Sequence, residues 1–220
     1  MKIFHSAQAW IARAAFGLAA CGLAATGLAH DGPHPAKAVK TSIAGKVDGD
    51  SSSSSAIAVK QQPGVRIPDV AVIDSGGKPQ RLAKSLDGAD AVMLNFVFTT
   101  CSTICSTQTA VLAEFQRRLV AEGKRARFVT VTIDPDNDTP ERLAAFARQF
   151  DIQRDWSFFT GEFDDLIRVQ QAFDVYRGSK AAHPPVVLLK RAHESTWVRI
   201  EGMAAPSDLL AVFDQRGMRR

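Results

Sequence analysis

Apolar and polar residues follow a pattern that predicts strands and helices in turn, from about residue 63 to the end of the chain. Short β-branched or apolar runs, which are typical of strands, lie at 70–74, 79–82, 91–98, 127–133, 156–159, 186–190 and 197–200. Apolar residues recur at helical spacing over 110–120, 140–150, 164–173 and 206–213. This order predicts an α/β fold in which helices cover both faces of a central sheet.

Turn and cap signals refine this prediction. The segment Ser75-Gly76-Gly77-Lys78 separates the first two strands and predicts an N-terminal β-hairpin. The run 91–98 is almost wholly apolar and suits a central strand that is covered on both faces. Asp138 and Glu141 stand at capping-box spacing, with Pro140 between them, and predict the start of a helix. Hairpins at both ends and β-α-β units between them indicate a mixed sheet.

The first 29 residues have the pattern of an export signal. Residues 14–29 are small or apolar and carry no charge, and Lys2 and Arg13 precede them. Gly27-Leu28-Ala29 offers a signal-peptidase site, so we expect a signal peptide at 1–29. Two alternatives stay open. Leu18-Ala19-Ala20-Cys21 has the form of a lipoprotein box, which would lipidate Cys21, and an uncleaved run would anchor the chain. All three predict a periplasmic protein, and the alternatives tether it to the outer face of the inner membrane.

Residues 30–62 contain much Ser, Gly and Lys and few large apolar side chains, which predicts a flexible linker before a domain at 63–220. The chain of 220 residues carries a formal net charge of +4. Residues 61–220 are nearly neutral, with 21 Lys and Arg against 20 Asp and Glu. The pattern offers no basic stripe on the domain, so we expect no nucleic-acid partner.

Cys101 and Cys105 are the pair of residues with the greatest reactive potential in the sequence. They lie between a predicted strand and a predicted helix. The positive end of a helix favours the thiolate, which is both a nucleophile and a soft metal ligand. A purely structural disulfide is a third reading, but a bridge over so short a loop restrains the unfolded chain little. The residues alone leave metal binding and thiol exchange open.

Four segments together resemble the Sco/SenC family over essentially all of residues 65–215. They are LNFVFTTCSTIC at 94–105, VTIDPDNDTPERLAAFARQF at 131–150, WSFFTG at 156–161 and a lone histidine, His183, before an apolar strand. The resemblance implies a thioredoxin-like fold. It also implies an exported protein that takes part in copper delivery to cytochrome c oxidase.

The resemblance further implies a copper site made of Cys101, Cys105 and His183. Two thiolates and an imidazole form a soft ligand set suited to Cu(I), although the resemblance leaves the copper as Cu(I) or Cu(II). The family usually has proline after each cysteine, whereas this chain has Ser102 and Ser106. These replacements keep the ligands and change the rigidity of the loop.

Two further expectations concern the segment around the third ligand. In thioredoxin-like folds a cis-proline commonly begins the strand that faces the cysteine loop, and Pro185 is the candidate here. A cis Pro185 would place His183 at the rim of the cysteine site. His193, in the turn-like sequence RAHEST, is expected to be exposed to solvent.

The resulting hypothesis is a copper-binding metallochaperone that delivers copper to the CuA site of cytochrome c oxidase, through subunit II or a similar copper-receiving protein. The alternative is an enzyme, a thiol–disulfide oxidoreductase that reduces the cysteines of the oxidase subunit or of another periplasmic client. Cys101 would then attack and Cys105 would resolve the mixed disulfide, with a thioredoxin-like reductase as partner. Only the metallochaperone needs His183.

Overall fold

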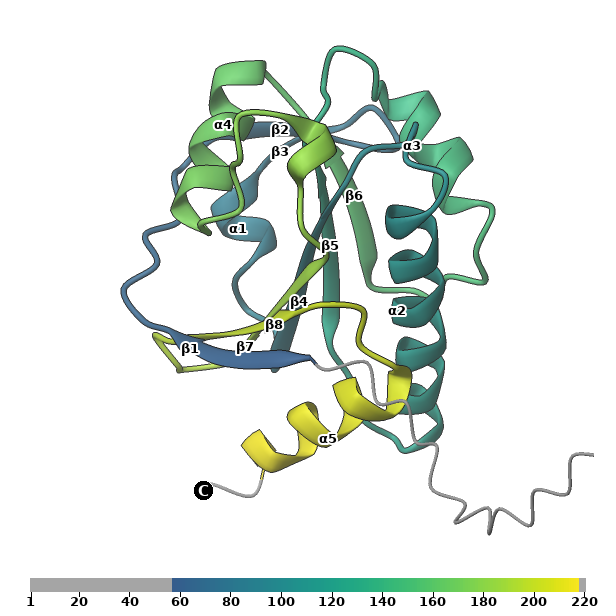
Figure 1. The fold of residues 1–220 in the computed structure, drawn as a ribbon, viewed down its shortest axis with the longest axis vertical. Helices are drawn as coiled ribbons and strands as arrows, with labels where there is room; N and C mark the ends of the chain where they lie inside the picture. The colour runs from purple at the N-terminus through teal and green to yellow at the C-terminus, as the bar shows by residue number, and fades with distance from the viewer. Residues whose placement is uncertain (1–56, 218–220) are drawn as a thin grey trace, which may run out of the picture. The chain divides into compact units, whose positions relative to one another are not determined.

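The computed structural model describes residues 57–217, which form an eight-stranded mixed sheet with the order β1-β8-β7-β4-β5-β6-β2-β3 (Figure 1). The neighbours β4, β5 and β6 are parallel, and every other neighbouring pair in this sheet is antiparallel. The strands are β1 (Ala58–Gln62), β2 (Ala71–Asp74), β3 (Pro79–Arg81), β4 (Ala91–Val97), β5 (Arg127–Thr132), β6 (Trp156–Thr160), β7 (Val186–Arg191) and β8 (Trp197–Glu201). The predicted mixed sheet and N-terminal hairpin are confirmed.

Helices cover both faces of this sheet, as the sequence pattern predicts. They are α1 (Leu82–Ser85), α2 (Ile104–Ala121), α3 (Pro140–Ala147), α4 (Phe163–Ala172) and α5 (Pro206–Gly217), with a 3₁₀ turn η1 at Lys180–Ala182. In Figure 1, α1 and α4 lie on one side of the sheet, and α2, α3 and α5 lie on the other. Within residues 57–217, none of the helices combines the length and the apolar character that a membrane span requires.

Strand β4 is buried along its whole length because both of its faces contribute to a hydrophobic core. Leu94 and Phe96 pack with side chains of α1 and α4. Met93, which points to the opposite face, packs with side chains of α2 and α5, Leu112 and Phe213 among them. Two helical layers on one strand explain why its sequence is nearly all apolar instead of alternating. The strand is therefore a rigid support for the residues that follow it.

The boundary expected at residue 63 is too late. Residues 58–62, which the composition assigned to the linker, form β1 and pair antiparallel with β8 from Ala58↔Glu201 to Gln62↔Trp197. Most of β1 is exposed at the edge of the sheet, so its residues carry no burial pattern that would reveal a strand. The expected signal peptide and the linker up to residue 56 lie outside the described residues.

The predicted capping box at α3 is wrong in its first member. The N-cap is Thr139, whose hydroxyl accepts a hydrogen bond from the backbone N–H of Arg142 at 3.3 Å, and Pro140 occupies the first turn as expected. Asp138, one residue earlier, is fully buried and points into the protein. A side chain with partners in distant segments is thus unavailable as a helix cap.

Candidate metal centre

Cys101 and Cys105 lie together where the chain passes from β4 to α2. The backbone N–H of Cys101 donates to the carbonyl of Phe98 at 3.0 Å, which closes a tight turn after the strand. Cys105 is in the first turn of α2, and its backbone N–H donates to the sulfur of Cys101 at 3.4 Å. Both cysteines are free thiols, Cys101 partly buried and Cys105 buried at 3% exposure. The pair stands at the positive end of an 18-residue helix.

The environment of Cys101 favours its thiolate. Burial alone would raise the pKa of Cys101, but hydrogen bonds from the backbone N–H and the thiol of Cys105 outweigh it. The backbone N–H groups of Thr103 and Ile104 act in the same direction, so the pKa of Cys101 lies below its ordinary value. Cys101 is therefore the more nucleophilic of the two thiols.

The environment of Cys105 has the opposite effect. Burial raises the pKa of Cys105 to about 12, and the negative charges of Cys101 and Asp138 add to the rise. Deprotonation of Cys105 therefore needs a compensating positive charge, such as a metal ion, or the formation of a sulfur–sulfur bond.

His183 lies just after η1 and its ring packs edge-on against Phe96, with ring centroids 6.3 Å apart. Both ring nitrogens are buried and neither has a hydrogen-bond partner among the described residues. Burial lowers the pKa of His183, although the backbone carbonyls of Phe96 and Val175 oppose the shift. A neutral imidazole with two unpaired nitrogens keeps a lone pair available for a metal ion.

The structure brings the two cysteines together but does not bring His183 into a cluster with them. Within residues 57–217, no three side chains of His, Cys, Asp or Glu are grouped so that they could hold a metal ion. The expectation of a cis Pro185 is also wrong, because every peptide bond in the described part of the chain is trans. His193 lies in an exposed turn, as expected. A site made of all three residues would thus require the segment around His183 or the cysteine turn to shift.

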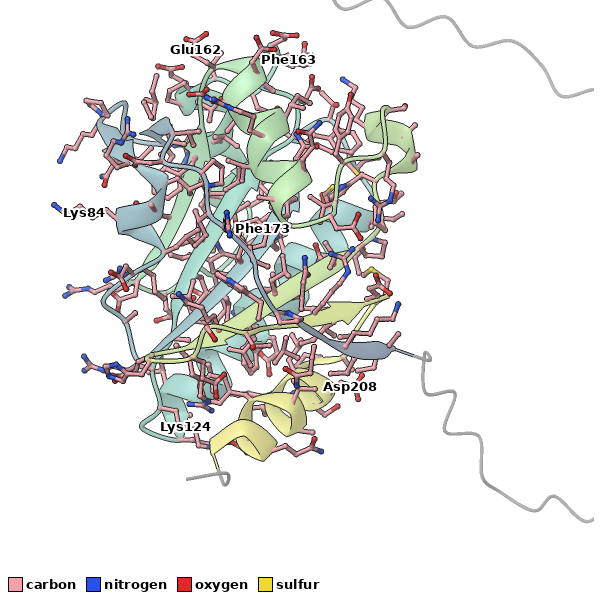
Figure 2. All side chains as sticks on the ribbon, turned by 90° about the vertical axis from the view of Figure 1, so that its left-hand side faces the viewer. Lys84, Lys124, Glu162, Phe163, Phe173 and Asp208 are labelled. Atoms are coloured by element: carbon pink, nitrogen blue, oxygen red, sulfur yellow. The ribbon has the colours of Figure 1, made fainter. Side chains whose placement is uncertain are left out.

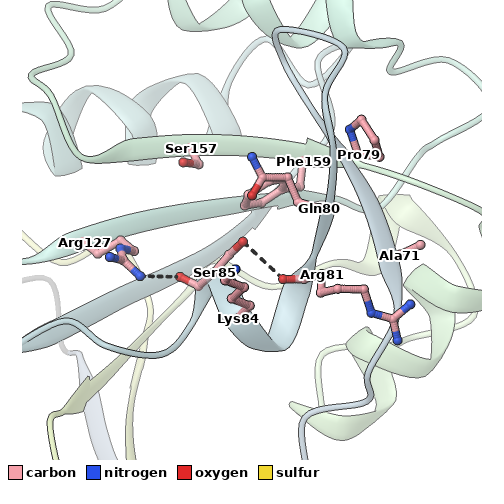
Figure 3. Close-up of a pocket in the computed structure, with 9 residues that line it drawn as sticks. All are labelled: Ala71, Pro79, Gln80, Arg81, Lys84, Ser85, Arg127, Ser157 and Phe159. Atoms are coloured by element: carbon pink, nitrogen blue, oxygen red, sulfur yellow. Dashed lines mark hydrogen bonds between the residues drawn. The ribbon is translucent and has the colours of Figure 1, made fainter.

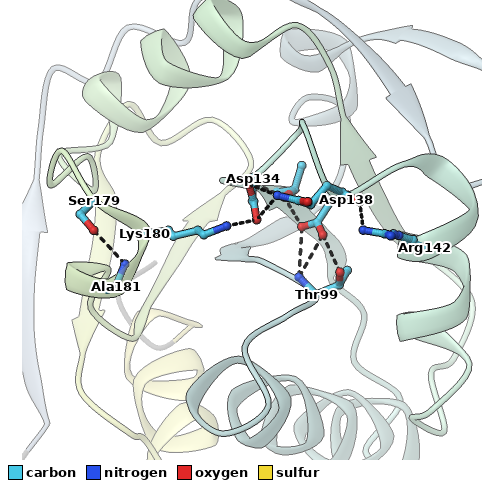
Figure 4. Close-up of polar contacts among 9 residues, drawn as sticks. Thr99, Asp134, Asp138, Arg142, Ser179, Lys180 and Ala181 are labelled. Carbon is cyan, nitrogen blue, oxygen red and sulfur yellow. Dashed lines mark hydrogen bonds and ion pairs between the residues drawn. The ribbon is translucent and has the colours of Figure 1, made fainter.

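Two carboxylates of the loop between β5 and α3 have partners in other segments of the chain (Figure 4). Asp138 accepts hydrogen bonds from the backbone N–H and the hydroxyl of Thr99, and from the hydroxyl of Thr132. Asp134 forms an ion pair with Lys180 of η1, with 2.5 Å between Nζ and Oδ2. One loop is therefore attached both to the cysteine turn and to the segment that carries His183.

His183 lines a cavity of about 140 Å³ together with Lys180, Asp134 and Phe163. Phe163 is half exposed at the start of α4, whereas Phe173, just beyond the helix, is buried (Figure 2). A larger groove of about 610 Å³ lies elsewhere, between the β2–β3 hairpin, α1 and the strands β5 and β6 (Figure 3). Its lining residues are Ala71, Pro79, Gln80, Arg81, Lys84, Ser85, Arg127, Ser157 and Phe159, which include neither of the predicted cysteines nor His183. Size alone thus does not mark the functional site.

Comparison with known proteins adds independent evidence. Residues 71–196 match the family model described as SCO1/SenC. The SCO1 protein homolog of Bacillus subtilis (strain 168) is 38% identical over 79 residues, which is 36% of this chain. The match spans 40% of that relative's own length.

Solved structures of the same family share the fold. BsSco, described as a member of the Sco family of cytochrome c oxidase assembly proteins with a disulfide switch, has a TM-score of 0.59 at 21% identity, and the match covers 72% of this chain and 96% of that chain. Yeast Sco1 with copper bound has a TM-score of 0.60 at 18% identity, covering 71% of this chain and 95% of that chain. These likenesses confirm the predicted fold class. Because the family model matches more than half of the chain, this protein belongs to the SCO1/SenC family.

Proposed function

We propose that this protein is an exported metallochaperone that binds copper through Cys101, Cys105 and His183 and delivers it to the CuA site of cytochrome c oxidase. The observation that carries the proposal is the close pair of free thiols at the start of α2, with the N–H of Cys105 directed at the sulfur of Cys101. Two sulfur ligands at this spacing suit a soft cargo ion. Copper is the cargo in this proposal, and the protein is its carrier.

The unpartnered imidazole of His183 supports the same proposal. A buried polar atom normally has a hydrogen-bond partner, and neither ring nitrogen of His183 has one among residues 57–217, which leaves the ring available to a metal ion. Membership of the SCO1/SenC family and the copper-bound structure of yeast Sco1 agree with copper as that use.

Each side chain would have its own role in loading. Cys101 offers a thiolate that its surrounding N–H groups already stabilise. Cys105 would lose its proton only as the ion arrives, so loading releases a proton and depends on pH. His183 would complete the set after its segment moves toward the sulfurs. A bound copper ion would supply the positive charge that offsets burial of both thiolates.

Delivery to an oxidase subunit and the periplasmic location are also proposals. BsSco is described with the cytochrome c oxidase assembly proteins, and subunit II is the subunit that we propose as the receiver. Export is supported by the pattern of residues 1–29, with Cys21 as the site of a lipid anchor in the alternative version. The lipid anchor would hold the domain close to a membrane-bound client, whereas cleavage after Ala29 would release the domain into the periplasm.

The unlike environments of the two thiols favour one second candidate, a thiol–disulfide oxidoreductase. A partly buried thiol with a lowered pKa and a buried thiol with a raised pKa are suited to attack and resolution. Cys101 would attack a disulfide of the client, and Cys105 would then displace the reduced client. This activity would need a thioredoxin-like reductase to restore the thiols and would not need His183.

A Cu(I) titration of the reduced protein against a competing chelator tests the first candidate. We expect one Cu(I) per wild-type chain and an affinity at least about tenfold lower for His183→Ala, since the loss of even an outer-shell partner typically costs 10–100-fold. His193→Asn is the matched control, because His193 is exposed and has a positive φ of 65° that asparagine tolerates.

Two outcomes separate the candidates. Wild-type copper affinity in His183→Ala, combined with rapid reduction of a disulfide in a CuA-type peptide by the same variant, would reject the metallochaperone in favour of the oxidoreductase. A collapse of affinity with unchanged sulfur exchange supports the metallochaperone. Cys101→Ser and Cys105→Ser abolish both activities and therefore do not discriminate.

A further inference from the structure

The carboxylate of Asp138 is fully buried and accepts hydrogen bonds from two other segments of the chain. The backbone N–H of Thr99 donates to its two oxygens at 3.1 and 3.2 Å, and the hydroxyl of Thr99 donates as well. The hydroxyl of Thr132, at the end of β5, supplies a further bond. Figure 4 shows Asp138 facing Thr99 across this contact. A buried charge is tolerated only when its oxygens are satisfied in this way.

The fold of α3 does not explain this carboxylate. Thr139 caps the helix, so the N-terminus of α3 does not need the side chain of Asp138. The donors to Asp138 are hydroxyls and a backbone amide, so the charge is buried at a desolvation cost that a neutral residue of the same size would avoid. The carboxylate accepts hydrogen bonds from both the backbone N–H and the hydroxyl of Thr99, and so holds this residue at two points.

Thr99 leads directly to the cysteine pair. Its neighbour Phe98 accepts the backbone N–H of Cys101 at 3.0 Å, so Thr99 lies within the turn that this bond closes. The sulfur of Cys101 in turn accepts the N–H of Cys105 at 3.4 Å. The contacts thus form a continuous series from Asp138 through the turn to both thiols.

We propose that Asp138 is a positioning residue for the cysteine pair: by holding Thr99, it fixes the turn that sets Cys101 against Cys105. The inference rests on the proposed function only in taking the two cysteines as the working site. If the turn loosens, the thiols spend less time in bonding geometry, and the effective concentration of one thiol at the other falls. A disulfide between them then becomes less favourable relative to two separate thiols.

The test is a glutathione equilibrium of the metal-free protein. One oxidised glutathione accepts two electrons and two protons from the thiols of Cys101 and Cys105, so that a disulfide forms in the protein and two reduced glutathiones are released. We expect Asp138→Asn to lower this equilibrium constant about tenfold, which corresponds to a reduction potential about 30 mV less negative. The amide keeps the size of the side chain but presents N–H groups where Thr99 also donates.

Two further variants of the turn and one remote control complete the design. Thr99→Val removes the hydroxyl but keeps the backbone N–H, so it should lower the glutathione equilibrium constant by less than Asp138→Asn does. Thr99→Ser keeps the hydroxyl and should therefore have the wild-type constant. Asp74→Asn is the matched control. Asp74 is also a carboxylate that accepts two backbone N–H groups, from Gly76 and Lys78, but it lies at the end of β2, next to the β2–β3 turn. Its replacement should leave the equilibrium constant unchanged.

The proposal is overturned if Asp138→Asn and Thr99→Val both keep the wild-type constant while the free energy of unfolding falls, since Asp138 then serves only the fold. If Asp138→Asn does not fold, Thr99→Val decides by the same criterion. The assay contains no copper, so its outcome is independent of the copper titration. Wild-type protein that forms the disulfide but does not bind copper would refute the metallochaperone and leave this inference standing.

Discussion

The backbone N–H of Cys105 points at the sulfur of Cys101 across 3.4 Å, so the second cysteine of the pair stabilises the thiolate of the first. The effect is not mutual, because a charged Cys101 raises the pKa of Cys105. Two residues of the same type thereby acquire different chemistry from one turn of helix. This asymmetry makes several measurements informative.

Alkylation should distinguish the two thiols. In reduced, metal-free protein we expect iodoacetamide to modify Cys101 first, with a pH midpoint below the ordinary thiol value, because neighbouring N–H groups stabilise its thiolate. Cys105 should resist until the pH approaches about 12. Peptide mass spectrometry after timed quenching gives both rates. In guanidinium chloride the two rates should become equal, and equal rates in the folded protein would contradict the assignment.

Protein stability should depend on pH through His183. Burial lowers the folded pKa of His183 below its usual 6.5, so the unfolded chain binds its proton first as the pH falls. The contribution of His183 to the free energy of unfolding should therefore be fully present above pH 6.5. It should be lost progressively as the pH falls from 6.5 to the pKa of the folded state. Urea unfolding between pH 5 and 8 measures the slope.

The controls for this pH dependence are two substitutions. His183→Gln should flatten the slope in that window, whereas His193→Asn should keep it, since His193 is exposed. A wild-type slope in His183→Gln would show that another group titrates there.

The position of the N-terminal boundary can be tested by truncation. A chain that begins at Ile57 keeps β1, whereas one that begins at Pro63 loses it and leaves the edge of β8 unpaired. We expect both to fold and the shorter one to be less stable by about 2–4 kcal/mol, at about 1 kcal/mol per backbone hydrogen bond lost. Lys60–Glu201 should add little because it is an exposed ion pair. Equal urea midpoints for the two chains would place β1 outside the cooperative domain.

Local patterns were sufficient to predict most of the fold. The hairpin follows from its turn, where Gly77 has a positive φ of 78° and the carboxylate of Asp74 accepts the N–H groups of Gly76 and Lys78. The apolar run at β4 likewise predicts a strand with two covered faces. Each of these signals lies within a few residues of the structure that it specifies.

Long-range contacts account for what the pattern did not predict. The edge strand β1 is defined by its partner β8, which lies far along the chain. Because most of β1 is exposed, its sequence has no alternation of apolar and polar residues that would indicate a strand. Asp138 has the spacing of a helix cap, yet Thr99, 39 residues earlier, determines where its side chain points. For the site, the spacing of Cys101 and Cys105 predicts their proximity. The separation of His183 from them depends on how η1 packs, which the sequence does not reveal.

The attachment of the β2–β3 hairpin to the rest of the sheet has a consequence for local unfolding. Among the described residues, β2 is in register with β6 at the two pairs Ile73↔Thr160 and Asp74↔Phe159, the N–H of Ser75 adds one bond to the carbonyl of Phe158, and β3 pairs with β2 alone. Strand β4 is instead held along most of its length between β5 and β7. Amide protons of the hairpin should therefore exchange with solvent through small openings of that edge, while those of β4 await global unfolding. The cysteine turn thus directly follows the strand whose hydrogen bonds we expect to open only when the whole domain unfolds.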